Sequence, residues 1–169
     1  FSFTEAVEAL TGPNFSPPSP APQARPKEQE PRKLVLPQPS RCATHVVSYL
    51  HGRGIDYDMI DYCIQTGRLY ESLPYHNAVF VGRDRQGQPR YAALRGIIGD
   101  FKGEATGSDK RYSFAIAEDS AAPSVHLFES AIDLLSYATL LKMKGRDWRQ
   151  DAMLSLGGVF KQKHEFVIP

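Results

Sequence analysis

The sequence is poor in cysteine, with only Cys42 and Cys63 among its 169 residues. Two cysteines are too few for a disulfide framework, and these two lie too far apart for a paired metal-binding motif. They indicate a reducing compartment, in which both thiols are expected to be small, partly buried apolar groups. The chain also lacks an apolar run of membrane-spanning length and a signal-peptide pattern, so we expect a cytoplasmic protein with no membrane partner.

The chain has almost no net charge, because 20 lysines and arginines stand against 19 aspartates and glutamates. A net charge of +1 gives no overall reason to expect a polyanion partner, so any such case must come from local clusters. The hydrophobic fraction of 41% is sufficient for the core of a domain of ordinary size. Because the chain starts at Phe1 and stops at Pro169 just after an apolar run, we expect an excised segment of a longer protein.

Changes in composition divide the chain into three predicted parts. Residues 1–40 show a short helical pattern followed by proline, serine and alternating charge, which predicts a short helix and a mobile linker. Residues 41–118 alternate helical and strand patterns and predict a basic α+β subdomain. Residues 119–169 predict the first βαβ half of a parallel sheet, so the fold class is α/β.

Within residues 41–118 a helical hairpin precedes several strands. Gly52 and Gly67 end the two helices. The segment from Gly96 to Tyr112 is rich in glycine and charge and predicts a loop or a distorted hairpin. The helices are expected at residues 43–50 and 56–66, and the strands at residues 69–71, 78–81, 90–94 and 113–117.

The chain is organised around a junction at Glu129. Residues 125–128 form an apolar run that predicts a buried strand, and the residues after Glu129 repeat apolar positions at helical spacing. A further strand is expected at residues 152–156, which completes a strand, a crossover helix and a parallel strand. The Glu129 carboxylate therefore falls at the carboxyl edge of the sheet, where ligands tend to bind. An acid held there is a candidate for metal or proton chemistry.

Helix capping explains some of the polar residues at this junction without a chemical role. Ser130 and Asp133 fit a capping box, in which a serine oxygen and a carboxylate satisfy backbone amides of the first helical turn. Capping alone would account for Asp133. It does not account for Glu129, which precedes the cap and has no apolar or turn-forming role there.

Basic side chains cluster between Arg83 and Tyr112. Glycines in this segment free backbone amides to approach an anion, with cations and a hydroxyl beside them. Phosphate groups of nucleotides or of nucleic acid would suit such a loop. The alternative is a solvated hairpin whose own acids neutralise its bases. The candidate phosphate-binding residues are Arg95, Lys102, Lys110, Arg111 and Tyr112.

Two other patterns indicate structure instead of chemistry. Asp56 and Asp58 have the spacing of a metal-binding acid pair, but they open a predicted helix, where acids complement the helix dipole. The histidines are dispersed, with no two at metal-ligand spacing in one helical segment, so ordinary polar contacts are expected for each. They are His45, His51, His76, His126 and His164, of which His76 could face the basic segment.

Residues 128–136, with the sequence FESAIDLLS, resemble the first motif of Toprim-like domains in primase-type proteins of plasmids and other mobile genetic elements. The preceding segment is similar to the domain of unknown function that usually stands upstream of such domains. More distantly, the layout is similar to the catalytic core of the bacterial replicative primase, in which a basic subdomain precedes the Toprim domain. The likeness extends from about Ser40 to Val159, with further matching motifs at residues 49–55, 75–82, 95–96 and 107–112.

The resemblance implies a DNA-binding nucleotidyltransferase of DNA replication, with Mg²⁺ as cofactor. Its expected partners are single-stranded DNA, nucleotides, and replication or conjugative-transfer proteins. Glu129 would be the catalytic residue, and Glu129 and Asp133 would be metal ligands. Arg95, Lys102, Lys110 and Arg111 would face phosphates of the template or the nucleotide.

Two departures from the family pattern qualify this expectation. Ser130 stands where the replicative primases have glycine, and the Asp-x-Asp pair that holds metal in that family does not follow Glu129 in this sequence. We therefore expect the segment alone to be inactive. A non-catalytic nucleic-acid-binding module and a Toprim-type metal-dependent nuclease stay open as alternatives.

Overall fold

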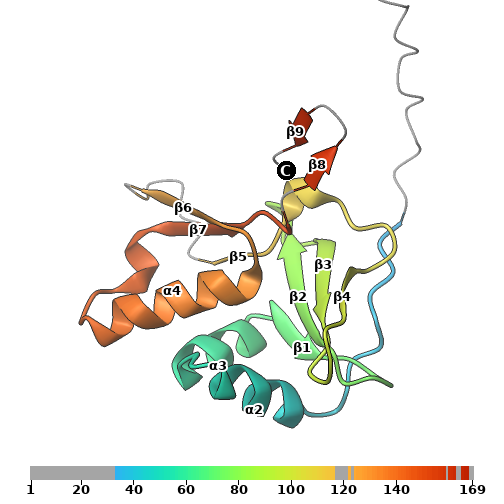
Figure 1. The fold of residues 1–169 in the computed structure, drawn as a ribbon, viewed down its shortest axis with the longest axis horizontal. Helices are drawn as coiled ribbons and strands as arrows, with labels where there is room; N and C mark the ends of the chain where they lie inside the picture. Colours follow the sequence, from blue (N-terminus) through green and yellow to red (C-terminus); the bar gives the residue numbers. More distant parts are fainter. Residues whose placement is uncertain (1–32, 117–121, 123, 159, 163–164, 168–169) are drawn as a thin grey trace, which may run out of the picture. The chain divides into compact units, whose positions relative to one another are not determined.

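A computed structural model describes residues 33–116, 122, 124–158, 160–162 and 165–167 of the chain (Figure 1). The helix expected at residues 1–10 and the linker up to residue 32 lie outside the described residues. No helix in the described part of the chain is long and apolar enough to cross a lipid bilayer.

Helices α2 (Thr44–Gly52) and α3 (Tyr57–Gln65) confirm the predicted helical hairpin. Asp56 caps α3, because its carboxylate accepts a hydrogen bond from the backbone N–H of Asp58 at 2.8 Å. The Lys142 ammonium donates hydrogen bonds to both carboxylates, with Nζ 2.7 Å from an oxygen of Asp56 and 2.5 Å from an oxygen of Asp58. The acid pair therefore stabilises the start of α3, as predicted, and it also binds Lys142, which was not predicted.

Four strands form an antiparallel sheet in the order β1-β2-β3-β4. β2 is the most buried strand, and β4 lies at one edge, within the segment predicted as a loop or distorted hairpin. The backbone N–H of Gly96 donates to the carbonyl of Phe101 at 2.9 Å and closes the β3–β4 hairpin. The strands are β1 (Leu69–Glu71), β2 (Ala78–Arg83), β3 (Pro89–Arg95) and β4 (Lys102–Glu104).

A second sheet has the order β5-β7-β6, with β6 parallel to β7 and β5 antiparallel to it. Helix α4 (Ala131–Met143) and the 3₁₀ helix η2 (Trp148–Gln150) connect the parallel pair, which confirms the predicted strand–helix–strand unit. The mixture of helices with antiparallel and parallel sheets agrees with the predicted α/β class. The other elements are η1 (Lys110–Tyr112), β5 (Ala115–Ile116), β6 (Val125–Phe128), β7 (Ala152–Ser155), β8 (Phe160–Gln162) and β9 (Glu165–Val167).

The prediction that residues 125–128 form a buried strand is wrong with respect to burial. β6 is an edge strand, and Val125 and Leu127 are 64% and 55% exposed. Only the alternate side chains, His126 and Phe128, turn inward, where both lie against the ring of Tyr137 in α4. The apolar run identified a strand correctly, but it could not show that one of its faces is uncovered.

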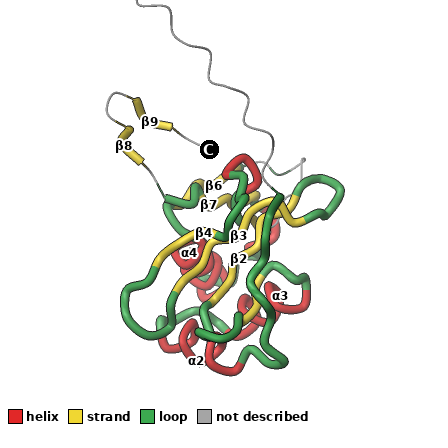
Figure 2. The backbone as a smooth tube through the Cα atoms, turned by 90° about the vertical axis from the view of Figure 1, so that its right-hand side faces the viewer, coloured by secondary structure: helices red, strands yellow, loops and turns green. Residues whose placement is uncertain are grey.

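Helices α2 and α3 lie against β1 of the antiparallel sheet, whereas α4 packs on β6 and β7 of the second sheet and touches α3 (Figures 1 and 2). The main core lies there and extends into the second sheet, since Phe80 of β2 meets Phe114 edge to face at 5.4 Å. A smaller apolar cluster occupies the opposite face, where Leu34 packs on β2 and β3. One continuous core therefore joins the antiparallel sheet to the parallel unit.

Residues 33–40, predicted to belong to the mobile linker, lie against the antiparallel sheet. The backbone N–H of Val35 donates to the carbonyl of Thr106 at 2.9 Å, and the Tyr70 hydroxyl donates to the carbonyl of Pro37 at 2.8 Å. Pro39 and Ser72 form an isolated β-bridge. The chain is therefore bound to the sheet from Val35 onward, several residues before the predicted end of the linker at residue 40.

The two cysteines occupy different environments. Cys63 is buried in the core, and its burial raises the pKa of the thiol to about 12. Cys42 is exposed, so the expectation that both thiols are partly buried is wrong for it. Cys42 precedes α2, where hydrogen bonds from the Thr44 side chain and backbone lower the pKa of its thiol.

Candidate functional site

A cavity of about 400 Å³ lies between the antiparallel sheet and the start of α4. Strands β3 and β4 form one wall, and the chain that follows β6 and β7 forms the other. β6 and β7 are parallel and in register, with Phe128 opposite Ser155, so both strands end at this wall. The predicted carboxyl edge of the parallel unit thus opens into a cavity, as expected for ligand sites in such sheets.

Two of the predicted site residues, Glu129 and Asp133, line the cavity from its parallel-unit side. Glu129 directly follows β6 and is exposed. Among the described residues, none donates a hydrogen bond or forms an ion pair with its carboxylate. Asp133 accepts a hydrogen bond from the Ser130 hydroxyl at 2.7 Å, and its backbone N–H donates to the same oxygen at 3.3 Å. The predicted serine cap is confirmed, but the Asp133 carboxylate binds the serine hydroxyl instead of a backbone amide, and this bond holds it at the cavity.

Cationic side chains face these acids from the other wall. Arg95 ends β3 and Lys102 begins β4, and both predicted residues line the cavity together with Arg53 from the end of α2. The Arg95 Nε donates to the Tyr49 hydroxyl at 3.4 Å, and the Arg53 guanidinium lies 5.8 Å from the centre of the Tyr49 ring. Tyr49 therefore supports two of the cations, and the charged lining holds more positive than negative groups.

Backbone groups complete the wall beside Glu129. Gly157 and Gly158 follow β7 with φ values of 65° and 91°, and the N–H of Gly158 donates to the Glu129 carbonyl at 2.9 Å. A β-carbon at Gly157 would lie 2.5 Å from the Tyr91 hydroxyl, so only glycine fits this turn. The first turn of α4 reaches the cavity at Ala131, and unpaired amides of a helix start attract anions.

The remaining predicted phosphate-binding residues do not line the cavity. The Lys110 ammonium lies 2.9 Å from Glu104 and donates to the Gly157 carbonyl at 3.1 Å, so it supports the cavity wall from behind. Arg111 is paired with Asp109, at 2.6 Å for the shortest contact. Tyr112 packs under the Arg90 guanidinium at 4.9 Å. Their contact with a phosphate stays a prediction.

The chemistry of the cavity is suited to a phosphate group accompanied by a divalent cation. Glu129 and Asp133 offer carboxylate oxygens, and Mg²⁺ is commonly held by one or two carboxylates together with substrate phosphates and water. The cations and the start of α4 offer partners for the phosphates themselves. The residues present therefore fit a Mg²⁺ that arrives with a nucleotide better than one held by protein alone.

Two residues of this site, Arg53 and Tyr49, were not predicted from the sequence as site residues. Both lie in residues 49–55, which were singled out only for their resemblance, and Arg53 stands between glycines that indicated a helix end. Their role depends on α2 packing beside the end of β3, a contact between distant parts of the sequence. A local pattern carries no signal for such a contact.

A segment of the chain that lines part of this cavity matches a known protein family. Residues 48–120 match the family described as "Protein of unknown function (DUF3991)". No curated protein matches the chain. Among solved structures, the catalytic domain of the DnaG primase bound to single-stranded DNA is similar with 16% identity and a TM-score of 0.42. The structural similarity covers 68% of this chain but only 49% of the primase chain. The segment that matches the family, residues 48–120, contains the cavity-lining cations Arg53, Arg95 and Lys102.

Proposed function

We propose that this chain binds the phosphate groups of single-stranded DNA and nucleotides in the cavity, as part of a primase-type nucleotidyltransferase. The observation that carries the proposal is the exposed Glu129 carboxylate, which has no partner in the part of the chain that the structure describes, in a cavity whose opposite wall presents Arg95 and Lys102. Within the described part of the chain no acid pairs with the Arg95 guanidinium or the Lys102 ammonium, whereas Arg111 is paired with Asp109. The geometry instead supports a site for an anionic ligand next to an acid.

Each side of the cavity has a separate part in this function. Arg53, Arg95 and Lys102 bind the phosphates, and Tyr49 orients the two guanidinium groups. Glu129 positions or activates the reacting group, and Asp133 contributes a second carboxylate. Mg²⁺, held by these two acids and the phosphates, would supply charge neutralisation at the reacting phosphate.

Nucleotidyl transfer requires more metal-binding carboxylates than this segment provides. The cavity presents two carboxylates, and no Asp-x-Asp pair follows Glu129 within the 169 residues. We therefore assign binding to the segment and polymerisation to a longer chain of a mobile genetic element that carries the later acids. In that chain the described unit would supply the basic wall and the first catalytic acid.

A template-directed synthesis assay on such a longer chain tests the proposal. The wild type is expected to make oligomers in the presence of Mg²⁺, and Glu129→Gln is expected to abolish them without loss of DNA binding. Asp61→Asn is a matched control, because Asp61 is an exposed acid of α3 outside the cavity lining. Failure of the wild type to make any product would remove the polymerase assignment.

The same assay distinguishes the two alternatives. Because the described cavity holds only two carboxylates, a non-catalytic nucleic-acid-binding module is the second candidate. It predicts DNA binding by the wild type with no product and no effect of Glu129→Gln. Shortened strands in place of extended ones would identify a metal-dependent nuclease.

A further inference from the structure

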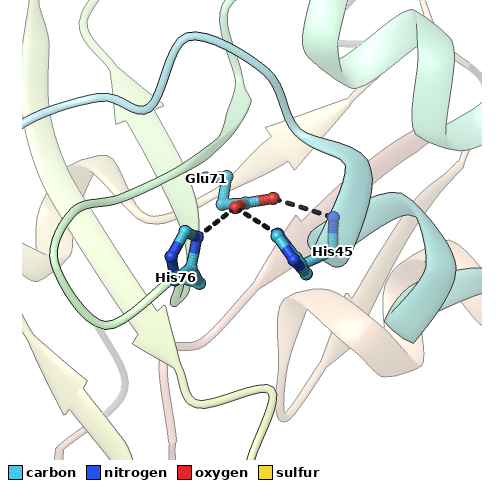
Figure 3. A group of neighbouring side chains, drawn as sticks. All are labelled: His45, Glu71 and His76. Carbon is cyan, nitrogen blue, oxygen red and sulfur yellow. Dashed lines mark hydrogen bonds and ion pairs between the residues drawn. The ribbon is translucent and has the colours of Figure 1, made fainter.

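A second group of side chains lies outside the cavity, at the N-terminal end of α2 (Figure 3). His45 belongs to α2, Glu71 ends β1, and His76 precedes β2. Their nitrogen and oxygen donor atoms lie within 4.8 Å of one another. His45 and His76 are far apart in the sequence and make the polar contacts that were expected, but the fold brings both to one carboxylate, which was not expected.

The Glu71 carboxylate is held in a fixed position by the backbone. Its side chain is fully buried, with 0% exposure. Oε2 accepts hydrogen bonds from the N–H groups of His45 at 3.0 Å and Val46 at 3.2 Å. These are amides of the first turn of α2, whose N-cap residue Ala43 offers no side-chain hydrogen bond. Glu71 thus caps the helix with one oxygen and keeps the other, Oε1, for the histidines.

Both imidazole rings converge on Oε1. The Nδ1 atom of His45 lies 2.9 Å from it, the Nδ1 atom of His76 lies 2.5 Å from it, and the ring centres are 4.7 Å apart. His76 has a φ of 54°, in the left-handed region that non-glycine residues seldom adopt. In this backbone conformation the His76 ring lies beside Glu71 at the end of β1 (Figure 3), so the convergence combines an uncommon backbone conformation with tertiary packing.

We propose that His45, Glu71 and His76 form a binding site for a divalent transition metal of the zinc type. Two imidazole nitrogens and one carboxylate oxygen are a donor set that Zn²⁺ accepts, with a fourth position left for water. Donors around a zinc ion with bonds of roughly 2.0–2.2 Å lie about 3.3 Å apart, so small rotations of the two rings would admit the ion.

The surroundings of the three donors agree with this assignment. The rings are 59% and 40% exposed while the carboxylate is buried, so an ion can enter from solvent and keep an open position. Oε2 is already bound by two amides, which is the kind of support that orients a ligating carboxylate.

Titration of the whole 169-residue protein with Zn²⁺ by calorimetry tests the site. The wild type is expected to bind one ion per chain. His45→Gln and His76→Asn are each expected to weaken binding by roughly 100-fold or more, since a ligand is lost outright. Asparagine is chosen at position 76 because it tolerates the left-handed backbone, and circular dichroism of each variant verifies that the fold is retained.

Two control variants make the result specific to these donors. His51→Gln removes another histidine of α2, one that stacks on Tyr57, and should bind Zn²⁺ as the wild type does. Cys42→Ser removes the exposed thiol and should also leave binding unchanged. Wild type that does not bind, or His45 and His76 variants that bind as tightly as the wild type, would overturn the proposal and leave the cluster a hydrogen-bonded helix cap. A thiolate absorption band in the Co²⁺-loaded protein would contradict the assigned donor set.

Discussion

Gly82 in β2 passes so close to Tyr112 that a β-carbon at Gly82 would lie 1.7 Å from the Tyr112 carbonyl oxygen. The carbonyl carbons of Tyr112 and Ser113 would lie 2.8 Å away. The antiparallel sheet and the η1 segment therefore meet backbone to backbone at this point. Because η1 leads into β5, the crossing fixes the second sheet against the first.

Gly82→Ala is expected to lower the free energy of unfolding by at least about 3 kcal/mol, because backbone atoms cannot move aside as a flexible side chain can. Urea denaturation followed by circular dichroism measures the change. Gly52→Ala is the control, since nothing lies within 4 Å of a β-carbon there and Gly52 is helical. It should be neutral or stabilising by up to about 1 kcal/mol. Equal effects of the two variants would contradict the close crossing.

Arg95→Ala and Lys102→Ala are expected to weaken binding of single-stranded DNA, because both cations line the cavity. Each should also reduce the slope of log K against log salt by about 0.7, the contribution of one phosphate contact on a single strand. Fluorescence anisotropy over a series of salt concentrations measures both quantities. Arg85→Ala, on the exposed β2–β3 turn, should change neither. A loss of affinity with an unchanged slope would mean that these cations do not contact phosphate.

Ser130→Ala is expected to destabilise the protein by about 1 kcal/mol, since it removes the side-chain cap of α4. It also removes the hydrogen bond that holds the Asp133 carboxylate, so Mg²⁺-dependent nucleotide binding should weaken as well. Thermal unfolding and nucleotide titration measure the two effects. Ser136→Ala, in the same helix, removes only a hydrogen bond to the Ile132 carbonyl and should change stability by less than about 0.5 kcal/mol. If both variants behave alike, the cap has no special role.

Lys142→Met is expected to destabilise the protein most between about pH 4 and pH 10. The hydrogen bond from Lys142 holds the pKa of Asp56 below its ordinary value of 3.8, so this stabilisation is present above that value and is lost as the pH falls through the folded-state pKa. The same acids raise the pKa of Lys142 above 10.5, so the contribution is also lost in strong alkali.

Denaturation of the wild type and the Lys142 variant at pH 7 and pH 3 measures this difference. The gap in stability should shrink at pH 3. Lys144→Met, at an exposed position just after α4, should show no such dependence on pH. A gap that stays constant with pH would show that the ionisation of Asp56 does not depend on Lys142.

Local patterns predicted most of the elements because each had its own start and stop signal. β1 was placed at its observed bounds, and α3 began after the predicted acid at Asp56. The parallel pair followed from an apolar run, a cap at Ser130 and a second apolar run. Burial was less predictable, because the exposure of Val125 depends on the neighbours of β6 in the sheet and not on the run itself.

The cavity was predicted in part. Glu129 and Asp133 lie there because the parallel strands end there, which the order of elements implied, but that order did not show that β3 and β4 would bring Arg95 and Lys102 to the same cavity. The other basic residues of the segment could not be sorted by composition, since Lys110 and Arg111 have acids close to them in sequence that bind them. The His45–Glu71–His76 cluster could not be predicted from the sequence, because its members come from α2, from β1 and from the loop before β2.

The hydrogen bond from Gly158 to the Glu129 carbonyl ties the acid to the end of β7. Any opening of that turn would displace the acid and the glycine wall in one cooperative event, because both depend on the same amide. Hydrogen exchange at the Gly158 amide would consequently report the lifetime of the assembled site, and a ligand that bridges the two walls should slow it.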